Sequence, residues 1–214
     1  MSDRPAILVT TQCFDKAKEL IDAANSEDPN CETSEGKDWP KELLYSRRMS
    51  DMLERYAPGA DDAMKLAVSA QHIQRWKSPR SDYPMDRKGY LQWRTGLNKF
   101  HAETIAILLV KAGYEKEFIA RVTQAVGKKS LTTNPDTQLL EDVAGLVFFE
   151  HYLVDFSDRH PEYNEQKWID IIRKIWNKMS CRAHQYALSG HIKLPDSLVK
   201  LIKKVASLNK SGSY

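Results

Sequence analysis

Apolar residues recur three or four positions apart along most of the chain, which is the spacing of one face of an α-helix. Met49, Met52 and Leu53 form one such set. No run alternates between apolar and polar residues over the length of a strand. The pattern predicts an all-α fold of about eight helices, at residues 15–25, 41–56, 61–77, 89–112, 118–126, 135–153, 162–188 and after residue 195.

Residues with restricted or special backbones mark several helix boundaries. Asn134 and Pro135 predict a capping residue followed by proline in the first turn of a helix. Gly113 is placed to end the preceding long helix in the left-handed conformation. Pro79 stops the helix before it, because the residue preceding a proline is pushed out of the helical region. The polar stretch 26–40 is predicted to be a loop.

The pattern predicts one main domain with an extension at each end. Residues 1–40 are expected to form an N-terminal helix and a polar loop, packed on a helical domain of residues 41–208. Residues 209–214 are rich in serine and glycine and are predicted to be a flexible tail. The apolar run at residues 6–9 is too short for a signal sequence, and no stretch is expected to cross a bilayer.

Composition indicates a globular protein with nearly balanced charge. Of the 214 residues, 42% are hydrophobic and 29% are charged, and the formal net charge is +3. So small a charge argues against a protein whose main task is the non-specific coating of nucleic acid. Three separated cysteines, Cys13, Cys31 and Cys181, argue against a disulfide framework or a thiolate zinc site. A cytoplasmic location is therefore expected.

Polar side chains suited to chemistry gather in one stretch of the chain. Arg75 follows His72 by three residues, so the two side chains are expected to be neighbours on a helix. Arg94, Asn98 and His101 are expected to form one polar stripe on the next helix, which is otherwise apolar. A core histidine with one satisfied hydrogen bond, or a stripe facing solvent, would explain these residues without a ligand. A metal or an anion between the helices would explain them together.

Glu141 and Asp142 stand inside the most apolar stretch of the chain. A buried carboxylate needs a partner or a metal, and Asp142 is the one predicted to face inward. The alternative is that both lie on the solvent-exposed edge of an amphipathic helix. Two imidazoles and one carboxylate, from His72, His101 and Asp142, fit a divalent metal with open coordination positions.

Basic residues accompany these candidate metal ligands. The planar guanidinium of arginine binds phosphate oxygens in pairs, so arginines near a metal indicate a phosphate-bearing ligand. Lys128 could add charge to such a site. Alternatively, Lys128 and Lys129 could donate hydrogen bonds to the last carbonyl oxygens of their own helix. The residues predicted to bind substrate are Arg48, Arg75, Arg80, Arg87, Arg94, Asn98 and Lys128.

Four short motifs carry a resemblance to a known family. They are Gln71-His-Ile-Gln-Arg-Trp, Tyr83-Pro-Met-Asp-Arg-Lys-Gly-Tyr, Leu140-Glu-Asp-Val and Trp176-Asn-Lys-Met-Ser. Over nearly the whole chain they resemble the DUF4202 family, a domain of unknown function. The order of His72, His101 and Asp142 also resembles the HD-domain superfamily of metal-dependent phosphohydrolases, over about residues 41–155. This second resemblance implies an HD-like helical fold in which those three residues hold the metal.

The chain departs from the HD pattern in two places. Ile73 follows His72 where the HD motif has an aspartate that binds the metal. Arg47 and Arg48 stand where an early histidine is expected. A rearranged site with one metal ion, and a site that binds phosphate through arginine without a metal, are both left open.

The leading hypothesis is an HD-like metal-dependent phosphohydrolase that acts on a nucleotide or another small phosphorylated substrate. The metal, Mn, Fe, Ni or Zn, would turn a bound water into the nucleophile, with Glu141 orienting that water and Asp142 among the catalytic residues. One alternative is a non-catalytic module that binds a nucleotide or RNA through an arginine-lined pocket, without a metal. Another is an iron-dependent oxygenase on the same scaffold. A small phosphate-bearing partner is expected, nucleic acid is not favoured, and no membrane partner is expected.

Overall fold

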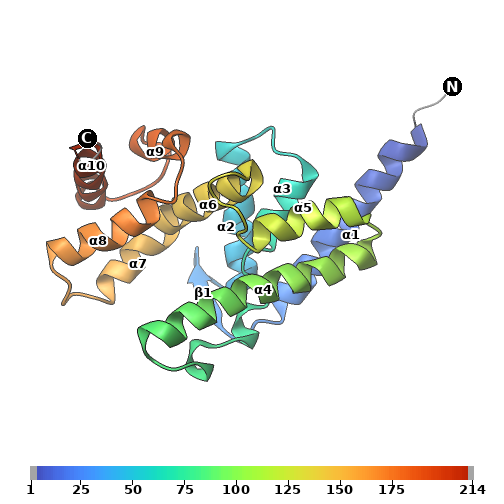
Figure 1. Ribbon diagram of the computed structural model, residues 1–214, viewed down its shortest axis with the longest axis horizontal. Coiled ribbons are helices and arrows are strands. Elements are labelled where there is room, and N and C mark those ends of the chain that lie inside the picture. Colours follow the sequence, from blue (N-terminus) through green and yellow to red (C-terminus); the bar gives the residue numbers. More distant parts are fainter. Residues whose placement is uncertain (1–3, 212–214) are drawn as a thin grey trace. The chain divides into compact units, whose positions relative to one another are not determined.

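The computed structural model describes the backbone of residues 4–211 and the side chains of residues 11–208 (Figure 1). Helices account for 71% of the chain, with ten α-helices in the described residues beside one small sheet of two strands. The all-α fold class is therefore confirmed, with more and shorter helices than expected. No helix within residues 4–211 combines the length and the apolar composition that crossing a membrane requires.

The chain divides into two compact units. Leu140 is the last residue of unit 1 and Glu141 is the first residue of unit 2. The division falls inside helix α6 (Pro135–Val147). Compactness alone does not make a folding domain, so the boundaries predicted at residues 40 and 208 stay predictions.

Unit 1 is built from helices, with one hairpin between the first two. Its elements in chain order are α1 (Arg4–Ser26), β1 (Cys31–Ser34), β2 (Lys37–Pro40), α2 (Lys41–Tyr56), α3 (Asp62–Ser69), α4 (Arg87–Ala112), α5 (Lys116–Val126) and the first part of α6. In Figure 1, α4 and α5 run side by side, and contacts between their residues support this pairing. Helix α1 packs against α2, α3 and α4, while α3 also packs against α2 and α5. Most of unit 1 is thus organised around α1 and α3.

Each main helix of unit 1 buries an apolar stripe. Ile21 of α1, Met49 of α2, Leu66 of α3 and Ile105 of α4 are all fully buried. Burial of each such side chain contributes about 1.5–3 kcal/mol, so this shared core holds the helices together. The apolar stripe of α4 is not continuous, because Leu91 near the start of the helix is 55% exposed.

Of the predicted helix ends, those at Asn134–Pro135 and at Gly113 are confirmed. The end predicted at Pro79 is wrong, because α3 ends at Ser69. Asn134 accepts hydrogen bonds from the backbone nitrogens of Asp136 and Thr137, at 2.9 and 3.4 Å. Pro135 is the first residue of α6. Gly113 follows α4 with a φ of 97°, a left-handed conformation that carries no steric penalty for glycine. These ends were readable because each depends on one residue and its immediate neighbours.

Residues 31–40 form an antiparallel hairpin where a loop was predicted. Cys31 pairs with Pro40 at its open end. Glu35 and Gly36 make the two-residue turn, with φ of 52° and 74°, as in the type I′ turn that matches the twist of paired strands. The prediction failed because both strands are four residues long and mostly polar, so they show no apolar alternation.

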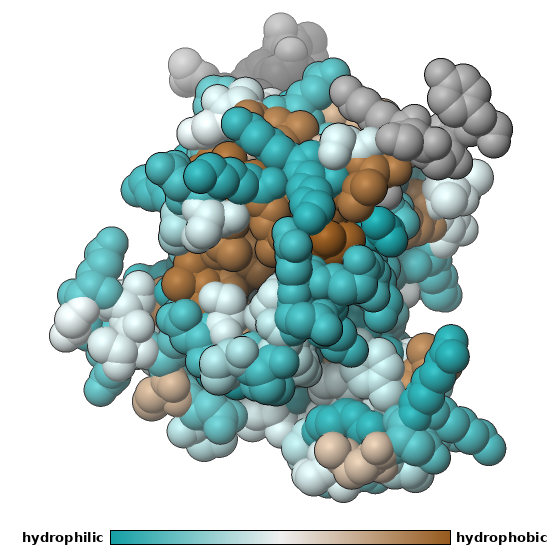
Figure 2. Space-filling model, turned by 90° about the vertical axis from the view of Figure 1, so that its left-hand side faces the viewer, coloured by the Kyte–Doolittle hydropathy of each residue, from teal (hydrophilic) through white to brown (hydrophobic). Residues whose placement is uncertain are grey.

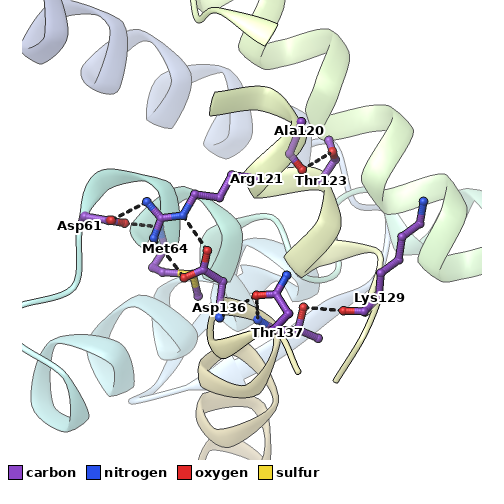
Figure 3. Close-up of polar contacts among 9 residues, drawn as sticks. Asp61, Met64, Ala120, Arg121, Thr123, Lys129, Asp136 and Thr137 are labelled. Carbon is purple, nitrogen blue, oxygen red and sulfur yellow. Dashed lines mark hydrogen bonds and ion pairs between the residues drawn. The ribbon is translucent and has the colours of Figure 1, made fainter. Parts of the chain in front are cut away.

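The junction between α5 and α6 is held by side chains of these two helices and by Asp61, the residue that caps α3 (Figure 3). The guanidinium of Arg121 donates to Asp61 at 2.6 Å and to both oxygens of Asp136 at 2.6 and 3.0 Å. The Thr137 hydroxyl donates to the carbonyl oxygen of Lys129 at 2.8 Å. Exposed ion pairs contribute little singly, but a two-pronged arginine shared by two carboxylates fixes geometry. The start of α6 is thereby tied to α3 and α5.

Unit 2 continues α6 through a π-helical segment into four further helices. Its remaining elements are η3 (Phe148–Tyr152, π-helical), α7 (Leu153–Asp158), α8 (Glu165–Trp176), α9 (Cys181–Leu188) and α10 (Asp196–Ser211). Helix α10 packs against α8 and α9. It extends into the predicted flexible tail of residues 209–214, and residues 212–214 lie outside the described part of the chain.

The single helix predicted over residues 162–188 is wrong, because two helices occupy that stretch. The Ser180 hydroxyl accepts a hydrogen bond from the Ala183 nitrogen at 3.2 Å and so caps α9. Met179, just before it, is buried against Gly145, where a Cβ would lie 2.7 Å from the Met179 sulfur. A cap and a buried side chain thus hold the turn between the two helices.

The surface distributes its apolar residues unevenly. On the face drawn in Figure 2, hydrophobic residues (brown) gather in one area that hydrophilic residues (teal) surround. Exposed apolar side chains include Leu91 and Val110 of unit 1 and Leu188 and Leu208 of unit 2. Single exposed apolar side chains are ordinary on proteins, so none of these residues by itself marks an interaction site.

Candidate functional site

A narrow pocket in unit 1 brings together most of the polar residues that the sequence singled out. It lies where the turn after α3, the middle of α4 and the turn after α5 meet. Its cavity volume of about 10 Å³ is far below the roughly 300–1,000 Å³ of pockets that enclose a drug-sized ligand. The lining consists of Gln71 and Leu97 together with six predicted site residues, His72, Arg75, Arg94, Asn98, His101 and Lys128.

The turn that carries His72 and Arg75 is held from α1. Helix α3 ends at Ser69, and Gln74 takes a left-handed conformation with a φ of 50°. The Gln74 nitrogen donates to the side-chain oxygen of the buried Asn25 at 3.1 Å. The prediction that the helix continues through this turn is wrong, because the helix ends before His72. The two side chains nevertheless contact each other as expected.

His72 holds the guanidinium of Arg75 at the pocket wall. Nη1 of Arg75 lies 3.0 Å from Nε2 of His72 and 3.4 Å from Nδ1, so the shorter contact is the one to Nε2. Because a guanidinium only donates, Nε2 accepts, and the ring hydrogen is assigned to Nδ1, which lies 3.5 Å from the Glu42 carboxylate. Tyr45 stacks on the ring with 4.1 Å between centroids. Burial, followed by the Arg75 charge, holds the pKa of His72 well below its usual value, so the ring is neutral at pH 7.

His101, on α4, presents an unpaired acceptor in the pocket wall. Its Nδ1 donates to the carbonyl oxygen of Ile73 at 2.8 Å, which places the lone pair on Nε2. Among the described residues, neither Nε2 nor the buried side-chain oxygen of Gln71 has a hydrogen-bond partner. Burial lowers the pKa of His101 to about 4; the bond to Ile73 opposes this shift, and nearby cations, first Arg75, add to it.

Glu42 borders the pocket and was missed at the sequence level. It lies in the first turn of α2, is 6% exposed, and faces His72. Burial raises the pKa of Glu42 to about 7; the Arg75 charge opposes this shift, and the Asp28 charge adds to it. A substantial part of this carboxyl is therefore protonated at neutral pH. Glu42 precedes Met49 by seven positions, or about two helical turns. The sequence therefore could have placed it on the buried face of α2.

Three cations converge on the two neutral imidazoles. Arg75, Arg94 and Lys128 each lower the pKa of both rings, so all three charges act on the same small volume. Lys128 reaches it from the turn after α5, where its φ is 55°. Because Glu42 is only partly ionised, the local charge is positive. A narrow, partly buried pocket of this charge attracts anions.

Three of the predicted arginines lie elsewhere in unit 1. Arg48 pairs with Glu32 of the hairpin. Arg80 donates to two backbone carbonyl oxygens of the loop before α4, at 3.0 and 3.2 Å. Arg87 lines a separate, open hollow along the start of α4. The pocket is assembled without these three residues, and their contacts with substrate stay predictions.

Glu141 and Asp142 belong to unit 2, where both side chains are buried. Asp142 accepts hydrogen bonds from the backbone nitrogen of Ser180 at 2.7 Å and from its hydroxyl at 2.5 Å. The carboxylate thereby ties the turn before α9 to α6. Its burial fits the expectation that it faces inward, whereas the metal-ligand role of Asp142 and the catalytic role of Glu141 stay predictions.

The residues around His72 and His101 do not fit the metal site that the HD-like pattern implies. The two rings lie 5.9 Å apart between centroids. Within the described residues, no group of three or more histidine, cysteine, aspartate or glutamate side chains is arranged to hold a metal ion. One nitrogen of His72 already faces the Arg75 guanidinium, and the charges nearby are positive. A metal cofactor stays a prediction that metal analysis must decide.

Comparison with known proteins places the chain in a family. A family model described as a domain of unknown function, DUF4202, matches residues 15–202. The chain therefore belongs to the DUF4202 family, as its motifs indicated. No curated protein and no solved structure matches it. The relationship to HD-domain phosphohydrolases stays a prediction.

The buried Glu42 gives a testable dependence of stability on pH. Its pKa rises from 4.5 to about 7 on folding, so the folded chain favours the protonated carboxyl. Stability from this group is complete below pH 4.5 and is lost as the pH rises through about 7. In Glu42→Gln, which mimics the neutral acid, this loss is absent. The free energy of unfolding of Glu42→Gln, relative to the unsubstituted chain, should therefore rise by about 2 kcal/mol between about pH 5 and pH 7.

Urea unfolding at a series of pH values measures this difference. The two pocket histidines are present in both chains, so their contribution largely cancels in the comparison. Glu54→Gln removes an exposed carboxyl from the same helix and is the matched control, which should show no such rise. If the difference in the free energy of unfolding between Glu42→Gln and the unsubstituted chain does not change with pH, the pKa of Glu42 is not raised by folding.

Proposed function

We propose that the pocket binds the phosphate group of a small phosphorylated molecule. The observation that carries this proposal is the convergence of Arg75, Arg94 and Lys128 on one narrow pocket of unit 1. Phosphate oxygens are charged and accept hydrogen bonds, so they match guanidinium and ammonium donors. The pocket offers these donors together with two neutral histidine rings.

Arg75 is the donor whose position is best defined before a ligand arrives. It donates to His72, and its guanidinium carbon lies 5.2 Å from the centre of the Trp93 ring, a cation–π arrangement. Trp93 is itself anchored, because its ring nitrogen donates to the carbonyl oxygen of Ser78 at 2.9 Å. A donor that is already held loses less conformational freedom on binding, which favours affinity.

Helix α4 supplies four of the eight residues that line the pocket. Arg94, Asn98 and His101 are spaced by four and three residues, and all three line the pocket as the predicted polar stripe required. The side-chain amide of Asn98 can donate to a phosphate oxygen. Lys128 adds its charge from a left-handed backbone conformation, a kind of strain that is often found at functional sites.

The size of the pocket limits how much of a ligand can enter. A cavity of about 10 Å³ has room for roughly one water-sized group, so it admits one oxygen of a phosphate and not a whole nucleotide. The rest of the ligand would then project from the opening. The His72 side chain keeps 22% of its surface exposed, so the pocket is not fully enclosed there.

Binding is better supported than hydrolysis. A base with a pKa of about 4, such as His101, contributes little to proton transfer at neutral pH. The proposal is therefore closest to the alternative of a non-catalytic module that binds a nucleotide without a metal. Metal-dependent hydrolysis with Glu141 and Asp142, RNA binding and an iron-dependent oxygenase each need a separate test.

Isothermal titration of the purified chain with inorganic phosphate and with a nucleoside monophosphate, at constant ionic strength, tests the proposal. Saturable binding of one phosphate per chain is expected, and it should survive treatment with a chelator. Heat no greater than that of a sodium chloride control would refute the proposal. Binding that is lost on chelation and restored by Mn or Ni would instead support the predicted metal-dependent site.

A further inference from the structure

Two buried acceptors in the pocket lack a donor. Nε2 of His101 and the side-chain oxygen of Gln71 belong to residues that are each 3% exposed. Neither atom has a hydrogen-bond partner in the described part of the chain. An acceptor left unpaired in a buried site costs about 1–3 kcal/mol. Two such atoms in one pocket need a hydrogen from outside the chain, and a ligand with an O–H group can supply it.

His101 cannot supply this hydrogen itself. Its single ring hydrogen lies on Nδ1 and is donated to the carbonyl oxygen of Ile73 at 2.8 Å. A second proton on Nε2 would add a positive charge beside Arg75, Arg94 and Lys128. The ring therefore presents Nε2 as an acceptor throughout the neutral pH range.

A fully deprotonated oxyanion is expected to bind weakly in such a pocket. The cations attract oxygen atoms that bear lone pairs, but Nε2 and the Gln71 oxygen bear lone pairs as well, so no hydrogen lies between them. Sulfate is an anion of this kind. Hydrogen phosphate has nearly the same size and shape but keeps one O–H group at neutral pH.

We propose that the pocket selects a phosphate that still carries its own hydrogen, and that this O–H donates to Nε2 of His101 or to the side-chain oxygen of Gln71. Arg75, Arg94 and Lys128 bind the remaining oxygens. An anion without the hydrogen leaves both acceptors unpaired, so it binds with lower affinity. This selectivity rests on the proposed function and narrows its ligand.

The requirement defines a class of ligand. A phosphodiester has no hydrogen on its phosphate, so the internal phosphates of a nucleic-acid strand do not qualify. A terminal phosphate monoester carries one below its second pKa of about 6. Inorganic phosphate carries one throughout the neutral range. The ligand is therefore inorganic phosphate or a singly protonated terminal phosphate.

Two matched pairs of ligands test the inference by titration of the full chain. At about pH 7 and constant ionic strength, phosphate should bind at least about tenfold more tightly than sulfate, the equivalent of one hydrogen bond to a buried acceptor. At about pH 5, methyl phosphate should exceed dimethyl phosphate by a similar factor. Both then carry about one negative charge, and only methyl phosphate has an O–H group.

His101→Asn should remove the preference for phosphate. The asparagine amide can keep the hydrogen bond to Ile73, but asparagine has no atom at the place of Nε2. Phosphate and sulfate should then bind within about threefold of each other. Gln71→Met is the second variant and is expected to reduce the preference for phosphate by a smaller factor. If His101→Asn does not fold, the result for Gln71→Met tests the inference.

The outcomes separate this inference from the proposed function. Equal affinities for phosphate and sulfate in the unsubstituted chain overturn the inference and leave the proposed function standing. An undiminished preference in both folded variants also overturns it. Binding of neither anion overturns the proposed function as well.

Discussion

Arg75→Met is expected to lower the affinity of the chain for inorganic phosphate about 100-fold, equivalent to about 2.7 kcal/mol. A hydrogen bond to a charged group contributes about 1.5–3 kcal/mol, and Arg75 is the pocket cation that both His72 and Trp93 hold in place. Methionine keeps an unbranched side chain that can still cover the Trp93 ring, so packing changes less than charge. Isothermal titration gives the ratio of the two dissociation constants.

Two further variants make this result specific. Arg87→Met removes an arginine that lines a different hollow of unit 1, and it should leave the phosphate affinity within about twofold. Arg75→Lys keeps the charge without the planar fork and should recover only part of the affinity. Equal losses for Arg75→Met and Arg87→Met would mean that general surface charge, and not the pocket, attracts the anion.

Asp142→Ala is expected to lower the free energy of unfolding by about 3 kcal/mol. Asp142 is 3% exposed and accepts hydrogen bonds from both the backbone nitrogen and the hydroxyl of Ser180. Removing the carboxylate leaves two donors without their acceptor and loosens the residue that caps α9. Thermal or urea unfolding measures the loss.

The matched controls separate this structural role from the predicted metal-ligand role. Asp142→Asn keeps the shape and one acceptor and should cost clearly less, while Asp155→Ala removes an exposed carboxylate and should stay within about 0.5 kcal/mol. Phosphate binding should be unchanged in Asp142→Ala, because the residues that line the pocket all belong to unit 1. Unchanged stability together with loss of a bound metal would support the metal-ligand prediction instead.

Helix ends were the most predictable part of the fold because their causes are local. Asn134 bonds to nitrogens two and three residues ahead, and Asp61 does the same for Met64 at 3.1 Å. Gly113 needs only its own left-handed backbone. None of these arrangements depends on a distant part of the chain, so the order of residues suffices to predict them.

Irregularities inside the helices were missed for a different reason. The stretch from Leu139 to Leu153 is apolar at most positions, so its periodicity cannot show where the π-helical segment Phe148–Tyr152 adds a residue to the turn. The break before α9 is set by the Asp142–Ser180 hydrogen bonds, whose partners lie 38 residues apart. Long-range contacts of this kind leave no trace in local spacing.

The same distinction applies to the site: contacts within one short segment were predicted, and contacts between distant segments were not. His72 with Arg75, and Arg94 with Asn98 and His101, were predicted correctly as neighbours, because each pair or stripe belongs to one short segment. Glu42 was missed because it meets His72 only after α2 packs in the fold. The sequence also left open whether a metal, an anion or solvent contacts these polar residues. That question depends on the tautomers of the two histidines and on the cations near them, which only the fold shows.

The indole of Trp93 lies between a backbone anchor at Ser78 and the guanidinium of Arg75. An anion that draws this guanidinium towards itself changes the electric field at the indole and hence its fluorescence emission. Trp93→Phe would separate that signal from the signals of the other tryptophans, since the chain contains five. Occupancy of the pocket can thus be followed optically, without a label and before the natural ligand is identified.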